Sequence, residues 1–403
     1  MNIGIVTTWF ERGAAYVSKQ FEEVLEKDHT VYIYARGEEY AIGNPNWDKR
    51  NVTWGKKIDS PFAGKVIDKK DFKKWISSND IELILFNEQH WFQPLLWCKE
   101  WKIKTVAYID YYTERTVDLF QAYDMLICNT KRHFSVFSWH KGAIYLPWGT
   151  NVDLFKPIIN EDELVKKEFV TFFHSCGWNI ERKGTRMLLE AFEEVKNAKK
   201  LIIHSQHEIT EKSVIQLIKK LENEGRLEII TKTVPAPGLF HLGDVYLYPT
   251  ILEGIGLTIA EALSSGLATV VPDNGPMNEF VKDKVNGRLI DIEKCYARND
   301  GYYWPKCIPK RSHLVKIIDE LAQSKDIVIE MKKSARKNSI SGLSFERNLK
   351  SLNSLITSVE LMPLKNEVID KIKAFDNYGF KKMNKYYMIF PTFFNFLRKN
   401  FFA

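Results

Sequence analysis

The sequence predicts an α/β protein made of two parallel-sheet domains. Short apolar runs alternate with amphipathic helical stretches along most of the chain, which is the pattern of parallel strands covered by helices on both faces. A chain of 403 residues is long for one domain and comfortable for two. A charged stretch at 160–168 interrupts the alternation, so we place a domain boundary near 157–168.

The first domain is predicted to span residues 1–157. A strand, a small-residue turn and a helix with Val17 and Phe21 on its apolar face open it as a Rossmann-like unit. No Gly-x-Gly-x-x-Gly follows the first strand, which argues against a nicotinamide dinucleotide site. Residues 37–66 are expected to be irregular. Strands are expected at 2–8, 29–35, 81–86, 105–109, 124–128 and 143–147. Helices are expected at 92–101, between the strands 105–109 and 124–128, and at 131–140.

The second domain is predicted to span residues 168–344 and to repeat this alternation. Its central strand is the apolar run 245–248, which Pro249 ends. The other strands are expected at 169–175, 201–204 and 227–230, and helices at 211–224, 313–322 and 325–340.

A glycine-rich turn joins the central strand to a helix that begins near Leu257. Gly254 and Gly256 allow a tight loop whose backbone N–H groups point beyond the strand end, where an anion would bind. Glu253 precedes this loop and Glu261 follows Glu253 by eight positions. A phosphate-seeking loop between two carboxylates suits a nucleotide sugar. Glutamates near a helix N-terminus also stabilise the helix dipole, so the spacing alone leaves a purely structural role open.

A second candidate anion site is the turn that carries Arg182 and Lys183 before Gly184. Arginine forks onto two phosphate oxygens and lysine supplies a point charge, beside a helix N-terminus that already favours anions. The alternative is a solvated basic turn, which is the usual role of an isolated Arg-Lys pair.

The run from Glu253 to Glu261 resembles the Glu-x7-Glu signature of the retaining family 4 glycosyltransferases. The resemblance continues through 264–271 and 275–279, although the family usually has Gly-Gly where this chain has Gly275-Pro276. Residues 148–157 are similar to the family's end-of-domain segment. The resemblance does not extend to the tail.

This resemblance implies the GT-B architecture, in which two Rossmann-like domains face each other across a cleft. Residues 1–157 would bind the acceptor and residues 168–344 the donor. A helix at 345–358 would cross back to the first domain. Outside the resemblance, we expect residues 361–403 to form a helical, basic and aromatic tail.

The implied activity is hexosyl transfer from a nucleoside diphosphate sugar, such as a UDP-sugar, with retention of anomeric configuration. The acceptor would be a glycan or a lipid-linked acceptor, as in the biosynthesis of surface polysaccharides and glycoconjugates. The chain has no Asp-x-Asp, so we expect neither a metal nor a cofactor. The implied catalytic residues are Glu253, Arg182 and Lys183, and the implied donor-binding residues are Glu261, Gly254, Ile255, Gly256, Leu257, Thr258 and Gly13.

Two polar residues at strand ends of the first domain, His90 and Asp110, are weaker candidates for contact with the acceptor or the transferred sugar. Family members often have a histidine where this chain has Asp110. Structural roles are equally open, since Asp110 could cap a helix and His90 could be a packed loop residue.

Three other functions remain open. A nucleotide-sugar epimerase of GT-B fold would turn over the donor without an acceptor. A non-catalytic protein would bind the nucleotide sugar and release no nucleotide. A glycosyltransferase acting on phage DNA would need a basic body, whereas five of the seven net positive charges lie in residues 361–403. We therefore expect no nucleic-acid partner.

Composition predicts a cytoplasmic protein. No run of eighteen apolar residues occurs, and the N-terminus reads as a strand and has no basic leader. The cysteine count is odd and lacks Cys-x-x-Cys spacing, so reduced thiols are expected and neither disulfides nor a zinc site. The cysteines are Cys98, Cys128, Cys176, Cys295 and Cys307.

Two segments have open roles. The tail at 361–403 interleaves eleven aromatic residues with its basic ones, which suits either peripheral docking on an anionic membrane or packing against protein. The aromatic insert at 295–305 could be a lid, an interface or a packed loop. The oligomeric state is not predicted.

Overall fold

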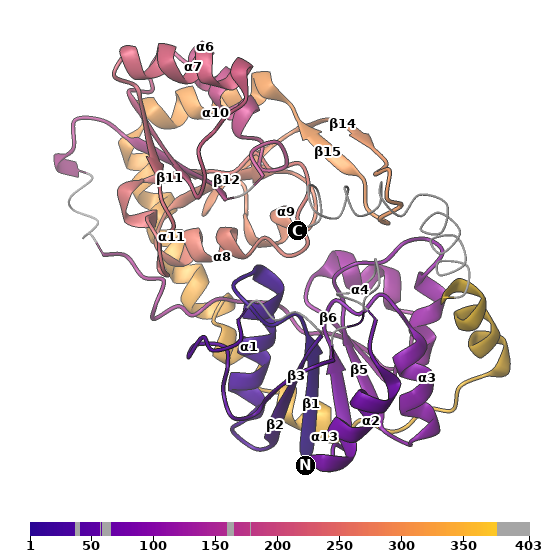
Figure 1. Ribbon diagram of the computed structural model, residues 1–403. Coiled ribbons are helices and arrows are strands. Elements are labelled where there is room, and N and C mark those ends of the chain that lie inside the picture. Colours follow the sequence, from indigo (N-terminus) through magenta and orange to yellow (C-terminus); the bar gives the residue numbers. More distant parts are fainter. Residues whose placement is uncertain (37–40, 57, 59–65, 159–164, 178, 377–403) are drawn as a thin grey trace. The chain divides into compact units, whose positions relative to one another are not determined.

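The computed structural model describes residues 1–36, 41–56, 58, 66–158, 165–177 and 179–376, and it divides the chain into two compact units (Figure 1). The first unit holds residues 1–145, except 130–132, together with the chain from Lys350 onward. The second unit holds residues 130–132 and 146–349. Residues 146–157, which we predicted would end the first domain, therefore belong to the second unit.

The first unit is built on a parallel sheet of seven strands in the order β3-β2-β1-β4-β5-β6-β7. The order reverses between β1 and β4, which makes the carboxyl ends of these two strands the expected binding edge. The strands are β1 (Asn2–Thr7), β2 (Thr30–Ala35), β3 (Val52–Trp54), β4 (Leu83–Phe86), β5 (Lys104–Tyr108), β6 (Met125–Cys128) and β7 (Ala143–Tyr145). The helices before the chain crosses to the second unit are α1 (Gly13–Leu25), α2 (Lys69–Ser78), α3 (Gln93–Glu100) and α4 (Lys131–Phe137).

Two elements of this unit differ from the prediction. The segment predicted to be irregular contains β3, which pairs in parallel with β2 at the edge of the sheet. The connection before β6 contains η1 (Val117–Ala122), a 3-10 helix where we expected an α-helix. Both elements are too short to show the periodic pattern of apolar residues by which longer helices and strands are predicted.

The second unit repeats this plan with six parallel strands in the order β10-β9-β8-β11-β12-β13. Here the order reverses between β8 and β11. The strands are β8 (Thr171–Gly177), β9 (Lys200–Ser205), β10 (Leu227–Thr231), β11 (Val245–Leu247), β12 (Ala268–Pro272) and β13 (Gly287–Ile290). The helices are α6 (Thr185–Glu194), α7 (Lys212–Asn223), η2 (Phe240–Leu242), α8 (Leu257–Ser264), α9 (Met277–Phe280), α10 (Arg311–Gln323), α11 (Lys325–Gly342) and α12 (Phe345–Asn348).

Central strand β11 is buried on both faces, as its continuous apolar run requires. Val245 and Leu247 belong to the core on one face of the sheet, together with residues of α6, α7 and α10. Tyr246 and Tyr248 belong to the core on the other face, together with residues of α8. The period of two along the strand therefore divides its side chains between two cores.

The predicted crossover helix 345–358 is two short helices. The first, α12, belongs to the second unit, and the second, α13 (Leu352–Thr357), belongs to the first unit and lies against α1. Beyond α13 the chain is held by Asp124, whose Oδ1 accepts from Met362 N–H at 2.6 Å. Residues 366–376 then form a helix, and the remainder of the predicted tail lies outside the described residues.

The predicted aromatic insert is the outer part of a two-stranded antiparallel ribbon formed by β14 (Ile292–Tyr296) and β15 (Lys306–Pro309). Cys295 lies opposite Cys307 in this ribbon and forms a disulfide with it. The expectation of reduced thiols was therefore wrong for these two residues, because the ribbon places distant cysteines side by side. The other three cysteines are free and buried.

None of the helices in the described part of the chain has both the length and the apolar character needed to cross a membrane.

Candidate active site

The candidate site lies at the carboxyl ends of β8 and β11, where the strand order of the second sheet reverses. The loop after β8 carries Arg182 and Lys183, and the loop after β11 carries Glu253. Chain positions about 70 residues apart are therefore brought together by the sheet topology. This juxtaposition is what an anion or nucleotide site in an open parallel sheet requires.

Backbone contacts lock the two loops to each other. Arg182 O accepts from Ile251 N–H at 2.9 Å and from Thr250 Oγ1 at 3.0 Å. Gly184 adopts a left-handed conformation at φ +71°, and a Cβ built there would lie 2.1 Å from the carbonyl oxygen of Pro249. Only glycine permits both the conformation and the close approach. The Lys-Gly pair of the sequence thus seats the basic turn on the loop after β11.

Glu253 is the centre of the polar contacts in this site. Its Oε1 accepts from Lys183 Nζ at 2.8 Å, Thr250 Oγ1 at 2.8 Å and the Tyr248 hydroxyl at 2.9 Å. Its Oε2 lies 3.0 Å from Arg182 Nη1. We predicted Arg182, Lys183 and Glu253 as site residues and the structure brings these three side chains together, whereas the roles of Tyr248 and Thr250 were missed.

The charges of this cluster are strongly coupled. Burial alone would raise the pKa of Glu253, but the positive charges of Lys183 and Arg182 outweigh it and lower this pKa to about 2. The carboxylate is therefore ionised at neutral pH. The side chain of Arg182 is 38% exposed and that of Lys183 only 14%, so Arg182 is the cation that a ligand reaches first from solvent.

His174 of β8 supports the cluster from within the core. Its Nδ1 lies 2.7 Å from Leu247 O and its Nε2 lies 2.8 Å from Thr185 Oγ1, so a neutral ring donates to the carbonyl and accepts from the hydroxyl. This histidine joins β8, β11 and the first turn of α6, between the two loops. Its role could not be predicted, because a single histidine within an apolar strand belongs to no motif.

We expect His174→Phe to destabilise the protein by about 2–4 kcal/mol, because it leaves a buried carbonyl and a buried hydroxyl without partners. Burial lowers the pKa of His174 from 6.5 to about 4. Above pH 6.5 the ring is neutral in both the folded and the unfolded chain, so its contribution to stability is fully present. As the pH falls toward 4, only the unfolded chain is protonated and this contribution is lost. Urea unfolding across this range should therefore show a weaker pH dependence in the variant. An identical dependence in both proteins would contradict this role.

Helix α8 presents an open N-terminus at the same edge. It begins after Gly256, which has φ +87°, and no side chain caps it. Within the described residues the backbone N–H groups of 255–257 donate no hydrogen bond, and Gly254 is exposed. Uncapped N–H groups at the positive end of a helix form an anion site. The predicted donor loop 254–257 thus lies directly beside Glu253.

The other predicted residues on α8 are Thr258 in its first turn and Glu261 one turn later. Both side chains are partly buried. Burial raises the pKa of Glu261 to about 7, and the charge of Lys183 opposes this shift. A carboxylate desolvated in this way gains from a ligand hydroxyl that donates a hydrogen bond to it.

The remaining predicted residues lie in the first unit. Gly13 is the first residue of α1, and a Cβ added there would meet nothing within 4 Å. His90 Nε2 lies 3.4 Å from Asp110 Oδ2, so the two weak candidates contact each other at the carboxyl edge of the first sheet. Beside them Glu88 adopts φ +55° and pairs with Arg12 at 3.2 Å. Glu88 and Arg12 belong to no motif, so their pairing was not predicted.

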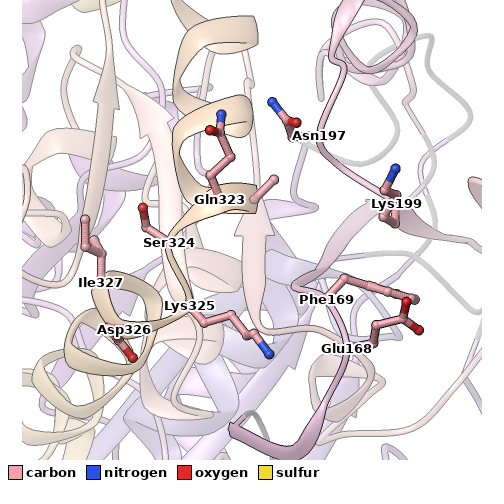
Figure 2. Close-up of a pocket in the computed structure, with 10 residues that line it drawn as sticks. Glu168, Phe169, Asn197, Lys199, Gln323, Ser324, Lys325, Asp326 and Ile327 are labelled. Carbon is pink, nitrogen blue, oxygen red and sulfur yellow. The ribbon is translucent and has the colours of Figure 1, made fainter.

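A separate hollow of about 700 Å³ lies at the opposite, amino-terminal edge of the second sheet (Figure 2). Phe169 on its wall lies two residues before β8, Lys199 directly precedes β9, and Ser324 lies at the corner between α10 and α11. Figure 2 shows side chains spread around its rim. None of the predicted site residues lines this hollow, so we do not place the activity there.

Part of the second unit matches known proteins in sequence. The family model of the glycosyl transferases group 1 matches residues 169–298. YtcC of Bacillus subtilis (strain 168), which is named as a glycosyltransferase, is 28% identical over 135 residues. That match spans 32% of this chain and 30% of YtcC.

Solved structures share the fold over most of the chain. Anabaena HepE in complex with UDP matches with a TM-score of 0.69 at 14% identity, over 89% of this chain and 99% of HepE. HepE in complex with UDP-glucose matches with a TM-score of 0.66 at 15% identity, over 89% of this chain and 100% of that chain. A glycosyltransferase from Rickettsia africae ESF-5 matches with a TM-score of 0.68 at 14% identity, over 89% of this chain and 98% of the other.

The two parallel-sheet units of this chain thus have the GT-B fold, and residues 169–298 match the family model of the glycosyl transferases group 1.

Proposed function

We propose that this protein is a retaining glycosyltransferase that moves a hexose from a UDP-type nucleotide sugar to a glycan or lipid-linked acceptor. The observation that carries the proposal is the cluster of Arg182, Lys183 and Glu253 beside the uncapped N-terminus of α8. Two cations and a set of free backbone N–H groups suit a diphosphate. The UDP and UDP-glucose complexes of HepE support this ligand class.

The chemistry follows from where charge develops. When the anomeric bond breaks, negative charge grows on the leaving β-phosphate, and Arg182, Lys183 and the N–H groups of 255–257 stabilise it. Glu253 holds the sugar hydroxyls and stabilises the developing positive charge, while Glu261 accepts hydrogen bonds from the ribose. The acceptor hydroxyl forms its bond to the anomeric carbon on the face that the phosphate leaves, and the departing phosphate takes the hydroxyl proton. The anomeric configuration is therefore retained without an enzymic nucleophile.

The basic cluster replaces a metal ion in this proposal. We therefore expect transfer to continue at an unchanged rate in excess EDTA, because Arg182 and Lys183 already supply the positive charge at the diphosphate. The assay is nucleotide release from UDP-sugars with glycan and lipid-linked acceptors. Loss of release in EDTA, with recovery on adding Mg²⁺ or Mn²⁺, would contradict the metal-independent part of the proposal.

The same assay tests the proposed function itself. Nucleotide release should require both a UDP-sugar and an acceptor, and the product should keep the anomeric configuration of the donor. Conversion of the UDP-sugar without acceptor into its epimer would indicate an epimerase. UDP binding with no release under any acceptor would indicate a binding protein.

A further inference from the structure

The ribbon formed by β14 and β15 is attached directly to the candidate site. The backbone N–H of Cys307 donates to Ile251 O at 3.0 Å, and the N–H of Ile251 donates to Arg182 O at 2.9 Å. Ile251 precedes Glu253 by two residues in the same loop. The ribbon is therefore joined at Cys307 to the loop system that carries the candidate catalytic residues.

The ribbon is an addition to the parallel-sheet plan of the second unit, and in Figure 1 it projects beyond the sheet. The disulfide between Cys295 and Cys307 joins its two strands one residue pair inward from Tyr296 and Lys306. An isolated two-stranded ribbon is marginally stable in water, so the covalent link keeps these strands paired. The outer residues are thereby held at a constant position relative to Ile251.

The outer part of the ribbon is rich in accessible aromatic rings. Tyr296 is 45% exposed and Tyr303 is 43% exposed. The ring of Trp304 packs edge-on against Tyr303 at 5.4 Å between centroids, and Lys306 Nζ lies 5.9 Å from the Tyr296 ring. Aromatic faces carry negative charge density, and the axial C–H groups of a pyranose present a weakly positive apolar face. The tyrosine hydroxyls add hydrogen-bonding groups at the ring edges.

We propose that the β14–β15 ribbon binds the acceptor glycan, contacting sugar units beyond the one that receives the transferred hexose. This inference rests on the proposed function, because the ribbon is attached to the loop of Glu253. It predicts an oligosaccharide acceptor in preference to a monosaccharide. The ring faces select carbohydrate by shape and C–H contact, while hydroxyl and charged groups between the rings bind its hydroxyls.

The charge of the ribbon favours a glycan over an anionic membrane. Residues 292–309 contain three cations and two carboxylates, so the net charge is only +1. One cation, Arg298, pairs with Asp300 and also lies 5.0 Å from the Tyr302 ring. Membrane attachment through electrostatics needs a larger excess of free basic side chains. A neutral carbohydrate needs none.

The test uses the full chain, the double variant Tyr296→Ala/Tyr303→Ala and the control Tyr145→Ala. Tyr145 is 37% exposed and lies on β7 in the first unit, so it matches the change in residue type and exposure. Each protein is applied with UDP to an array of oligosaccharides ending in glucose, galactose or N-acetylglucosamine. The methyl glycoside of each terminal sugar is included. UDP affinity is measured separately by calorimetry.

We expect the wild type and the control to bind at least one oligosaccharide about tenfold more tightly than its methyl glycoside, and the double variant to lose this difference. UDP affinity and melting temperature should be unchanged, since both side chains are exposed. Unchanged oligosaccharide binding by the double variant, or no oligosaccharide preference in the wild type, would overturn the inference. Failure of the wild type to bind any nucleoside diphosphate would instead overturn the proposed function.

A separate measurement tests whether the ribbon binds a membrane. Each protein is also sedimented with vesicles of phosphatidylcholine and phosphatidylglycerol. If the double variant loses vesicle binding and keeps its oligosaccharide binding, the ribbon is a membrane contact and the glycan proposal is wrong.

Discussion

Replacing Glu253 by glutamine is expected to reduce the transfer rate by about 10²–10³-fold and to destabilise the fold by about 3 kcal/mol. The amide keeps the shape and an acceptor oxygen for Tyr248 and Thr250, but it removes the charge that balances Lys183 and Arg182. Two cations then face each other in a buried site without a carboxylate. Steady-state nucleotide release and urea unfolding measure the two effects.

The two effects have distinct signatures. The pKa of Glu253 is lowered from 4.5 to about 2, so its stabilisation is present above pH 4.5 and is lost as the pH falls toward 2. Glu253→Gln should flatten the pH dependence of unfolding in this range. UDP should also raise the melting temperature more in the variant than in the wild type, because the diphosphate supplies the missing negative charge.

Glu190→Gln is the matched control for this change. Glu190 pairs with Arg186 at the surface at 3.1 Å, so its replacement should alter stability by well under about 1 kcal/mol. Wild-type transfer in Glu253→Gln would contradict the role of this carboxylate. Wild-type stability would contradict its role as the counter-charge of the cluster.

Removing both basic residues, as Arg182→Ala/Lys183→Ala, is expected to weaken UDP binding by about 10²–10⁴-fold. Each charge-assisted hydrogen bond contributes about 1.5–3 kcal/mol, and each 1.4 kcal/mol is a factor of ten in affinity. Isothermal titration with UDP measures the loss. Uridine, which lacks the diphosphate, should bind the variant and the wild type equally.

The single variants should differ from each other. Arg182 is the more exposed of the two, so Arg182→Ala should chiefly weaken UDP binding. Lys183 is the buried partner of Glu253, so Lys183→Ala should also destabilise the fold. Arg186→Ala, which removes an exposed cation of α6, should leave UDP affinity unchanged. Equal affinity of UDP for the double variant and the wild type would contradict a diphosphate site at this turn.

Much of this site could be predicted from the sequence because its parts follow strand ends. Arg182, Lys183 and Glu253 each lie in the loop that follows an apolar run, and parallel strands bring their carboxyl ends to one edge. The fold class and most strands followed from the same apolar runs. The partners of Glu253 were harder to predict. Tyr248 and Thr250 lie at the end of the apolar run, and only the folded loop brings their hydroxyls to the Glu253 carboxylate.

The missed features depend on contacts distant in sequence. Residues 146–157 join the second unit because Thr150 pairs with Ser344 and Arg336 donates to Val152 O at 2.8 Å, which no local pattern reveals. The Cys295–Cys307 disulfide depends on the register of a ribbon that the aromatic insert conceals. In the sequence the two cysteines are simply twelve residues apart, a spacing that does not by itself predict a disulfide. His174 functions through two hydrogen bonds that exist only in the folded sheet.

The most direct test of the central claim is a crystal structure of this protein with UDP. We expect the diphosphate within hydrogen-bond distance of Arg182, Lys183 and the N–H groups of 255–257. A well-ordered diphosphate bound away from both the basic turn and the N-terminus of α8 would contradict it.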